Sequence, residues 1–219
     1  MGGRLDRGLR MGPRIFRYVV AHDGGVAPQP FDGYCTLAIC KPQIRRAARV
    51  GDWVIGFRGR MVGHVTYVMQ VDEVLTLAKY WDDRRFANRR PGRTRTPDNI
   101  YRPGHDGYLL QVPNEVHGPG EVQTDVGGRN ALVSRRFWYF GSSSPRISPD
   151  LSHLIHRHIG HAVDINRRDD DVERLLRWLS TWSLGLHGSP VDRTLIDRPM
   201  AESGCRKKAT PVKGKAARC

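Results

Sequence analysis

The feature of this sequence that most constrains its fold is a pair of apolar runs, DWVIGF at residues 52–57 and MVGHVTYVMQVDEVL at residues 61–75. Only Arg-Gly-Arg separates the two runs, and both are rich in β-branched and aromatic side chains, so the pattern predicts a β-hairpin. Because the second run is longer than an ordinary strand, we expect it to curl. The hairpin therefore predicts a bent antiparallel sheet.

Further strands and short helices are predicted on both sides of this hairpin. Pro42 suits the first turn of a helix that ends at Gly51, and Thr76 can cap a helix through Trp81. The segment 82–99 is rich in charge and is predicted to be a loop. Apolar runs that indicate strands occur at residues 14–20, 34–40, 108–112 and 131–140.

Residues 169–184 give the clearest helical pattern. Acidic residues occupy the first turn, Gly185 can end the helix, and apolar side chains recur on one face. We expect this face to pack on the core, and it predicts nothing about activity. Its members are Val172, Leu175, Leu176, Leu179 and Trp182.

The length of the chain, 219 residues with 39% hydrophobic side chains, predicts one core. We expect a single α+β domain over residues 14–190, a flexible N-terminal extension over residues 1–13 and a disordered basic tail over residues 191–219. No run of about 18 apolar residues and no apolar signal core occur. The prediction is a cytoplasmic protein with no membrane partner.

The net charge of +14 is concentrated near the ends of the chain. Residues 1–14 carry +3 and residues 198–219 carry +6, which leaves +5 for residues 15–197. Basic ends attract any polyanion, and a solvated end with no dedicated partner is the alternative. The charge therefore supports contact with nucleic acid only weakly.

Five stretches of the chain together resemble one known family. They are YVVAHDGG (18–25), PFDGYCTLAICKPQIRRAARVGDWVIGF (30–57), LTLAKYWDDRRF (75–86), DNIY (98–101) and FWYFG (137–141). The chain resembles the nucleotide modification associated domain 2 family, a bacterial and phage group, and CTLAICKP with GDWVIG is the most specific part. The resemblance implies an association with systems that modify DNA bases, and it implies no particular activity.

The helix that leads into Gly-Asp-Trp-Val-Ile, with the aliphatic strand after it, also resembles the core of the PUA-like domains, including EVE, ASCH and YTH domains. This resemblance implies a small mixed β-barrel with peripheral helices. In those domains an aromatic-lined pocket holds a flipped or single base. The resemblance therefore implies that the chain recognises a nucleotide or modified base in DNA or RNA and need not alter it.

Cys35 and Cys40 are the candidate reactive groups. Four cysteines in a chain of this length are too few for a disulfide framework, so reduced thiols are expected. An odd separation along a strand puts the two thiols on opposite faces, and zinc needs further ligands, so we predict no metal and no cofactor. Either thiol could be a nucleophile if His22 and Asp23 supplied a base. The alternative is a pair of buried structural thiols.

A base-binding pocket is predicted around Trp53, which follows a Gly-Asp turn and whose ring can stack on a base. Lys41 and Arg45 can hold phosphate, whereas His22 and Asp23 can bond to a base edge. The alternatives are a core tryptophan and a solvated helix face. The predicted ligand-binding residues are Tyr18, His22, Asp23, Tyr34, Lys41, Arg45, Trp53 and Tyr139.

Residues 84–95 hold six arginines and no acidic residue. Arginine forks suit bidentate contacts with phosphate, and the alternative is a solvated loop. The residues predicted to contact a nucleic-acid backbone are Arg49, Arg84, Arg85, Arg89, Arg90 and Arg93.

Three functions stay open at this point. The first is a binding module that recognises a nucleotide or modified base, with nucleic acid and proteins of a base-modification system as partners. The second is an enzyme that acts on a nucleotide or base through Cys35 or Cys40. The third is an accessory protein of a modification operon that has no ligand of its own.

Overall fold

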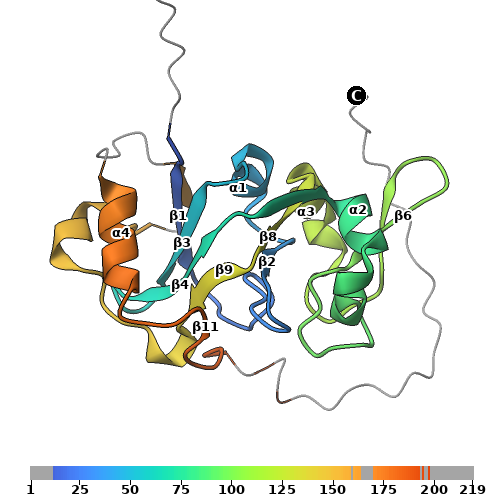
Figure 1. The fold of residues 1–219 in the computed structure, drawn as a ribbon. Helices are drawn as coiled ribbons and strands as arrows, with labels where there is room; N and C mark the ends of the chain where they lie inside the picture. The colour runs from blue at the N-terminus through green and yellow to red at the C-terminus, as the bar shows by residue number, and fades with distance from the viewer. Residues whose placement is uncertain (1–11, 159, 164–169, 193, 195–196, 198–219) are drawn as a thin grey trace, which may run out of the picture.

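The computed structural model describes residues 12–158, 160–163, 170–192, 194 and 197. Residues 1–11 of the predicted N-terminal extension and most of the predicted basic tail lie outside these residues. The described chain forms a six-stranded sheet, a three-stranded sheet and a two-stranded hairpin, with short helices around them (Figure 1). The predicted single α+β domain is confirmed. No helix in the described part is long and apolar enough to cross a membrane.

The six-stranded sheet has the strand order β10-β1-β3-β4-β9-β11. β3 and β4 form the predicted hairpin, with Trp53 opposite Gln70, and β1 runs parallel to β3. Between β1 and β3 the chain passes through β2 and α1 (Pro42–Ala47). The strands are β1 (Ile15–Val20), β3 (Trp53–Arg58), β4 (Val65–Gln70), β9 (Arg136–Tyr139), β10 (His161–Val163) and β11 (Gly185–Leu186).

The three-stranded sheet has the order β2-β8-β5 and consists of β2 (Cys35–Leu37), β5 (Glu73–Thr76) and β8 (Asn130–Ser134). β4 runs into β5 after Val71 and Asp72, and Arg135 alone joins β8 to β9. Each of these two continuous segments contributes one strand to the large sheet and one strand to the small sheet. The expected curl of the second run is thereby confirmed. Both strand orders are open in the described residues, so the closed PUA-like barrel stays a prediction.

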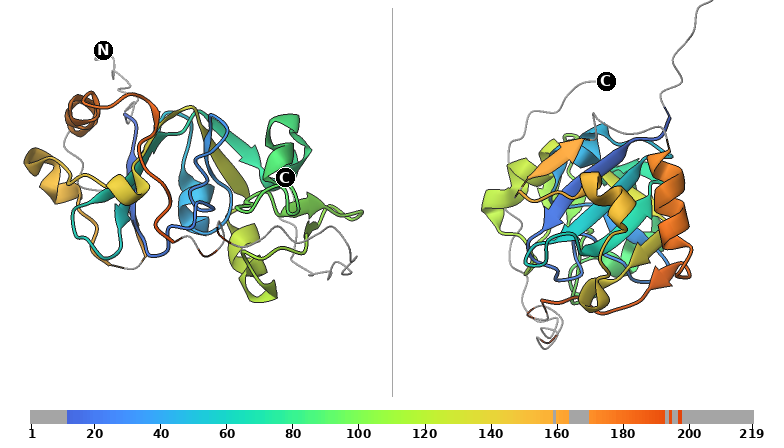
Figure 2. Two further views of the ribbon diagram at one scale, coloured as in Figure 1. Left: turned by 90° about the horizontal axis from the view of Figure 1, so that it is seen from below. Right: turned by 90° about the vertical axis from the view of Figure 1, so that its left-hand side faces the viewer.

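The two faces of the large sheet are both covered. One face packs against β2 and α1 in a cluster that includes Phe16, Tyr67 and Leu132. The other face packs against η4 (Pro149–Leu154) and α4 (Asp171–Leu179), which lie together at one side of the molecule (Figures 1 and 2). The predicted apolar stripe is confirmed, because its members on α4 and the following turn all belong to or pack on this second cluster.

A third layer covers the outer face of the small sheet, at the opposite side of the molecule from α4 (Figure 1). Thr76 caps its first helix as predicted, since its Oγ1 accepts the N–H of Lys79 at 3.2 Å. The layer contains α2 (Leu77–Asp82), η1 (Arg84–Arg89), β6 (Tyr101–Pro103), β7 (Leu109–Gln111), η2 (Pro119–Glu121) and α3 (Val122–Gly127). A short turn, η3 (Gly141–Ser143), follows β9.

The prediction of a loop without regular structure over residues 82–99 is wrong. The 3₁₀ helix η1 occupies its first part, and Phe86 is buried against Tyr80, with ring centroids 4.6 Å apart. Arg89 and Asp98 are also buried. The many charged residues of this segment obscure the one apolar ring that is buried, Phe86. Because η1 buries Phe86, it also brings Arg89, about one turn later, into the core.

Gly56 in β3 leaves room for the ring of Tyr67. A Cβ at this position would lie 2.3 Å from Tyr67 Cε1 and 2.8 Å from Val20 Cγ2. Gly56→Ala is expected to destabilise the fold by about 1–3 kcal/mol, which lowers the thermal midpoint by roughly 2–12 °C. Gly120→Ala is the control, because nothing lies within 4 Å of its Cβ. Equal midpoints for the two variants would contradict this packing.

Candidate functional site

Cys40 lies in the sharp turn that joins β2 to α1. Cys40 and Lys41 both have a left-handed backbone, with φ of 56° and 42°, which non-glycine residues rarely adopt and which costs about 1–3 kcal/mol each. Pro42 begins α1 immediately afterwards. A strained residue between a strand and a helix is also the local geometry of a nucleophile elbow, which presents a reactive side chain at the top of a tight turn.

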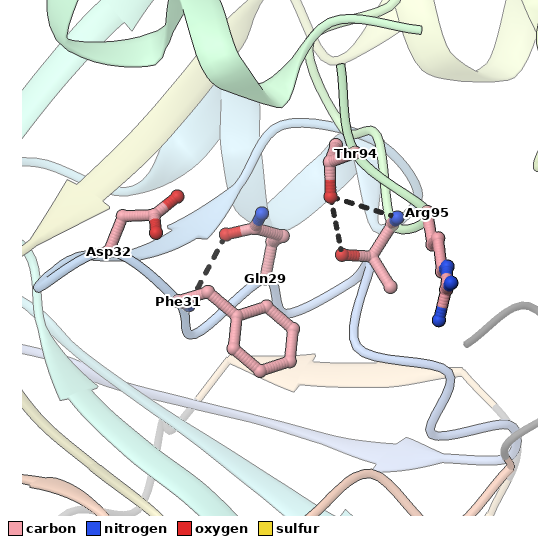
Figure 3. Close-up of a pocket in the computed structure, with 6 residues that line it drawn as sticks. Gln29, Phe31, Asp32, Thr94 and Arg95 are labelled. Atoms are coloured by element: carbon pink, nitrogen blue, oxygen red, sulfur yellow. Dashed lines mark hydrogen bonds between the residues drawn. The ribbon is translucent and has the colours of Figure 1, made fainter. Parts of the chain in front are cut away.

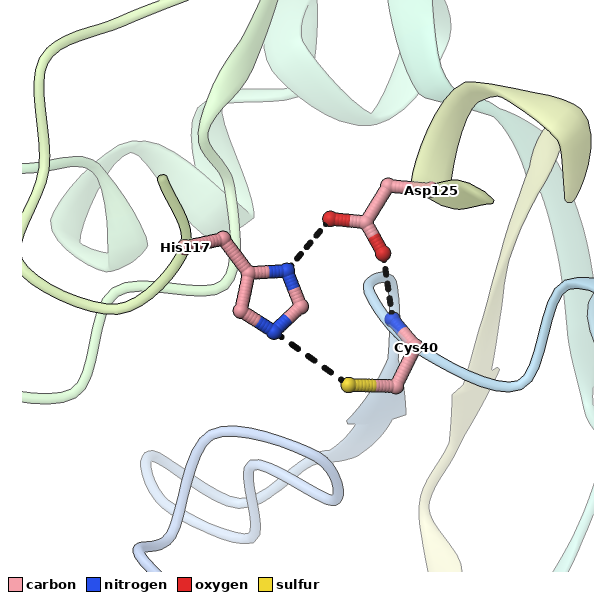
Figure 4. Close-up of side chains that lie close together, drawn as sticks. All are labelled: Cys40, His117 and Asp125. Carbon is pink, nitrogen blue, oxygen red and sulfur yellow. Dashed lines mark hydrogen bonds and ion pairs between the residues drawn. The ribbon is translucent and has the colours of Figure 1, made fainter. Parts of the chain in front are cut away.

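Cys40, His117 and Asp125 form a chain of hydrogen bonds (Figure 4). Cys40 Sγ lies 3.4 Å from His117 Nε2, and His117 Nδ1 lies 2.6 Å from Asp125 Oδ2. The thiol and the imidazole are partly exposed, whereas the carboxylate is buried. A thiol, an imidazole and a carboxylate in this order make the arrangement of a catalytic triad.

Asp125, in α3, is held by the other groups around it. Its Oδ1 accepts the backbone N–H of Cys40 at 2.7 Å, and its Oδ2 accepts the hydroxyl of Tyr101 at 2.8 Å. The carboxylate therefore bonds both to the His117 ring and to the backbone of Cys40. Because Nδ1 of His117 faces this carboxylate, Nε2 is the ring nitrogen that faces the sulfur.

Arg45 connects the segments that carry the site. Its guanidinium is fully buried and donates to the carbonyl oxygens of Cys40 and Asn130, at 2.6 Å and 2.7 Å, and to that of Asp125. It also lies 3.9 Å from the Asp125 carboxylate, and burial lowers the pKa of Arg45 to about 10. Gly128 leaves room for the Arg45 guanidinium, because a Cβ at residue 128 would lie 2.4 Å from the guanidinium carbon.

The pKa of His117 is raised to about 10. Burial alone would lower it, but the hydrogen bonds to Asp125 and Cys40, together with their negative charge, outweigh the burial. The imidazole is therefore protonated at neutral pH and donates from both nitrogens. An imidazolium beside a sulfur suits a thiolate–imidazolium pair, the reactive form in cysteine enzymes.

The same three side chains offer three possible metal ligands, whose ligand atoms lie within 4.8 Å of one another. The geometry favours hydrogen bonding over a metal site. Cys40 and Asp125 contact opposite nitrogens of the His117 ring, so one ion at Nε2 could bind the sulfur but would leave the carboxylate on the far side. Zinc sites use at least three protein ligands around one ion. The carboxylate therefore fits the role of a partner that orients the ring.

Three of the four aromatic residues predicted to line a base pocket lie in the core, and the fourth, Tyr34, is partly exposed. Tyr18, Trp53 and Tyr139 are at most 1% exposed. The hydroxyls of Tyr18 and Tyr67 are 3.0 Å apart, and Trp53 stacks on Trp138 with ring centroids 6.4 Å apart. Base binding by these rings stays a prediction, and it requires their present packing partners to move.

The polar residues predicted beside that pocket have other partners. Tyr139 donates its hydroxyl to buried Asp23, and burial raises the pKa of that carboxyl. His22 is exposed and lies 4.0 Å from Asp192. Cys35 is fully buried, and burial raises the pKa of its thiol far above the ordinary range. Lys41 places its ammonium 4.6 Å over the Tyr18 ring.

The structure distributes the predicted backbone-contact arginines over three environments. Arg89 is 1% exposed and serves as a core cation. Arg90 is partly buried, with its guanidinium 4.3 Å over the Trp81 ring. Arg85 pairs with Glu73 and Asp83 and lies 5.7 Å over the predicted ligand residue Tyr34. Exposed side chains belong to Arg49, Arg84, Arg85 and Arg93.

His117 and Asp125 are functional candidates that the sequence-based prediction missed. Both lie between residues 97 and 130, where Gly, Pro and Asn hide any periodicity. The available signal was a histidine and an aspartate eight residues apart in a segment that is otherwise poor in both strand and helix patterns. That signal does not reveal which thiol they meet, because Cys40 is 77 residues before His117.

Comparison with known proteins assigns this chain to a family. The model of nucleotide modification associated domain 2 matches residues 12–196, a range that contains Cys40, His117 and Asp125. No curated protein and no solved structure matches the chain. Because the family model matches well over half of the chain, the chain belongs to the nucleotide modification associated domain 2 family.

Proposed function

We propose that this domain is a cysteine-dependent enzyme that acts on a nucleotide or base within a nucleotide-modification system, with Cys40 as its nucleophile. The observation that carries this proposal is the chain of hydrogen bonds from the Cys40 thiol through His117 to buried Asp125. The left-handed turn at Cys40 supports it, because strained backbone of this kind clusters at active sites. The family's association with nucleotide modification supports a nucleotide or base as the substrate.

Each residue of the site has a separate role in this proposal. The Cys40 thiolate forms a bond to an electrophilic carbon of the substrate, and the displaced electron pair moves to a heteroatom that takes a proton from His117. A water molecule then gives a proton to the neutral imidazole and bonds through its oxygen to the same carbon, and the carbon–sulfur bond breaks with its electron pair returning to the Cys40 thiolate. Asp125 and Tyr101 hold the imidazole in position, and Arg45 holds the turn of Cys40 against α3.

The second candidate is the binding module that the sequence favours, which recognises a base without altering it. It shares the support of the family's association with nucleotide modification. It loses support at its predicted pocket, because Trp53 is 1% exposed and packed against Trp138. The thiol site has partly exposed reactive groups and is the better candidate for chemistry.

The proposal is tested with the full chain and defined probes. The four deoxynucleoside 5′-monophosphates and a single-stranded DNA oligonucleotide of mixed sequence are each incubated with the protein, and products and intact protein mass are followed by mass spectrometry. We expect conversion of a probe, or an adduct that peptide mapping assigns to Cys40. Cys40→Ser is expected to lose conversion by about 10²-fold or more and to form no adduct.

Cys35→Ala is the matched control, since it removes the other thiol of the described chain and leaves the hydrogen bonds of Cys40 intact. It is expected to retain activity within about threefold, after correction for the folded fraction. Equal conversion by Cys40→Ser and the wild type would contradict the proposal. Absence of both conversion and adduct with every probe would also contradict it.

A further inference from the structure

A shallow cavity lies apart from the thiol site, between the loop before β2 and the segment after η1. Its volume is about 330 Å³, at the lower end of the range for small-molecule sites. A nucleoside or nucleotide is a ligand of suitable size for such a cavity. The lining residues are Gln29, Phe31, Asp32, Thr94, Arg95 and Thr96 (Figure 3).

Gln29 brings a buried amide to this cavity. The residue is 1% exposed, and its backbone pairs with Thr36 through two hydrogen bonds of 2.9 Å. Its side-chain Oε1 accepts the backbone N–H of Phe31 at 3.3 Å, and this contact fixes which end of the amide is oxygen (Figure 3). The Nε2 group has no acceptor in the described part of the chain. Nε2 is not one of the buried atoms that lack a partner, so water reaches it from the cavity, and a ligand acceptor would replace that water.

Phe31 and Asp32 add an aromatic face and an acceptor. The Phe31 ring is partly exposed and lies next to the Gln29 amide (Figure 3). Asp32 has a left-handed backbone, φ 55°, and its exposed carboxylate makes no hydrogen bond or ion pair with any described residue. One wall of the cavity therefore presents a π-face, an N–H donor and two carboxylate acceptors.

The loop of residues 29–34, which carries these groups, is fixed by hydrogen bonds from a buried arginine. Buried Arg89 donates to the carbonyl oxygens of Gln29, at 3.2 Å, and of Phe31 and Tyr34, and it also bonds to Thr36 Oγ1. A single side chain thus fixes three carbonyls of the loop. A loop held in this way loses little conformational entropy when a ligand binds.

We propose that this cavity binds a guanine base. The Phe31 ring stacks on the base, Gln29 Nε2 donates to the guanine O6, and the two Asp32 oxygens accept N1–H and the exocyclic N–H. A carboxylate accepts two adjacent donors in parallel, and only guanine among the four DNA bases presents a ring N–H and an amino group side by side. The inference deepens the family's link to nucleotides and does not depend on Cys40 as a nucleophile.

The test measures affinity for dGMP, dAMP, dCMP and dTMP by calorimetry. The wild type is expected to bind dGMP at least tenfold more tightly than the other three. Gln29→Glu keeps the acceptor for Phe31 and replaces the donor by an acceptor, so dGMP affinity is expected to fall at least tenfold. Gln43→Glu, the same change on an exposed residue of α1, is the control and is expected to leave affinity unchanged.

A second variant keeps the test decisive if Gln29→Glu does not fold. Asp32→Asn is tolerated at a left-handed exposed position and is expected to reduce the preference for dGMP at least tenfold. The preference for dGMP is measured by binding and the proposed enzyme is tested by conversion at Cys40, so failure of one is distinguishable from failure of the other. A single-stranded oligonucleotide with one guanine, compared with dGMP, shows whether the base comes from nucleic acid or a free nucleotide. Equal affinity for all four nucleotides, or dGMP affinity that neither variant lowers, would overturn the proposal.

Discussion

A His117→Gln variant is expected to react with iodoacetamide at Cys40 more slowly than the wild type at pH 5.5, by a factor on the order of ten. In the wild type the imidazolium lies 3.4 Å from the sulfur, and its positive charge favours the thiolate over the thiol. Glutamine supplies no such charge, so the rate of the variant should fall more steeply than that of the wild type as the pH is lowered. Peptide mapping separates Cys40 from the other cysteines.

Two measurements accompany this experiment. His22→Gln, which changes an exposed histidine paired only weakly with Asp192, is expected to keep the wild-type pH profile. The folded-state pKa of His117, about 10, lies above its ordinary value, so the stabilisation it contributes is complete below about pH 6.5 and is lost as the pH rises towards 10. The thermal midpoints of wild type and His117→Gln should converge over that interval. Parallel alkylation profiles for the two proteins would refute the thiolate–imidazolium pair.

An Arg45→Met variant is expected to be destabilised by about 3–5 kcal/mol, with a thermal midpoint lowered by roughly 6–20 °C. The change leaves His117 as the one charged partner of Asp125 among the described residues, and it removes buried donors from the carbonyls of Cys40, Asn130 and Asp125. Methionine fills much of the volume, so the loss reports mainly on polar interactions. Denaturation by heat or urea, followed by circular dichroism, measures it.

Arg46→Met is the matched control for this variant. Arg46 is the next residue of the same helix, carries the same charge and is exposed, so its midpoint should change by less than about 2 °C. Comparable losses for the two variants would mean that helix charge matters and the buried contacts of Arg45 do not. Arg45→Lys is expected to be destabilised as well, because a single ammonium cannot replace three diverging donors.

The β3–β4 hairpin, the cap at Thr76 and the apolar face of α4 could be predicted, because each depends on contacts between residues close in sequence. The role of Arg45 could not be predicted in the same way. The sequence predicts a helix to Gly51, with Arg45 and Arg49 one turn apart on a phosphate-binding face. In the structure α1 ends at Ala47, so Arg49 lies beyond the helix and is exposed, whereas Arg45 is buried where α3 docks against α1.

The residues of the candidate site were even harder to predict from local sequence patterns. Residue type alone marks Cys40 as a candidate nucleophile, and the sequence offers His22, 18 residues before it, as the base. In the structure the imidazole beside Cys40 Sγ is that of His117, from a segment whose sequence has no period. Pairing of side chains across such a distance depends on the tertiary fold, and a single sequence carries no direct record of it.

The sequence separation of 77 between Cys40 and His117 also has a consequence during synthesis of the chain. At a translation rate of about 5–20 residues per second, the thiol is made roughly 4–15 s before its base exists. During that interval Cys40 is an ordinary thiol with no imidazolium beside it. The enzyme proposed here would therefore acquire its reactivity only when the late segment has docked, so that incomplete chains released from the ribosome would be chemically silent towards nucleotides.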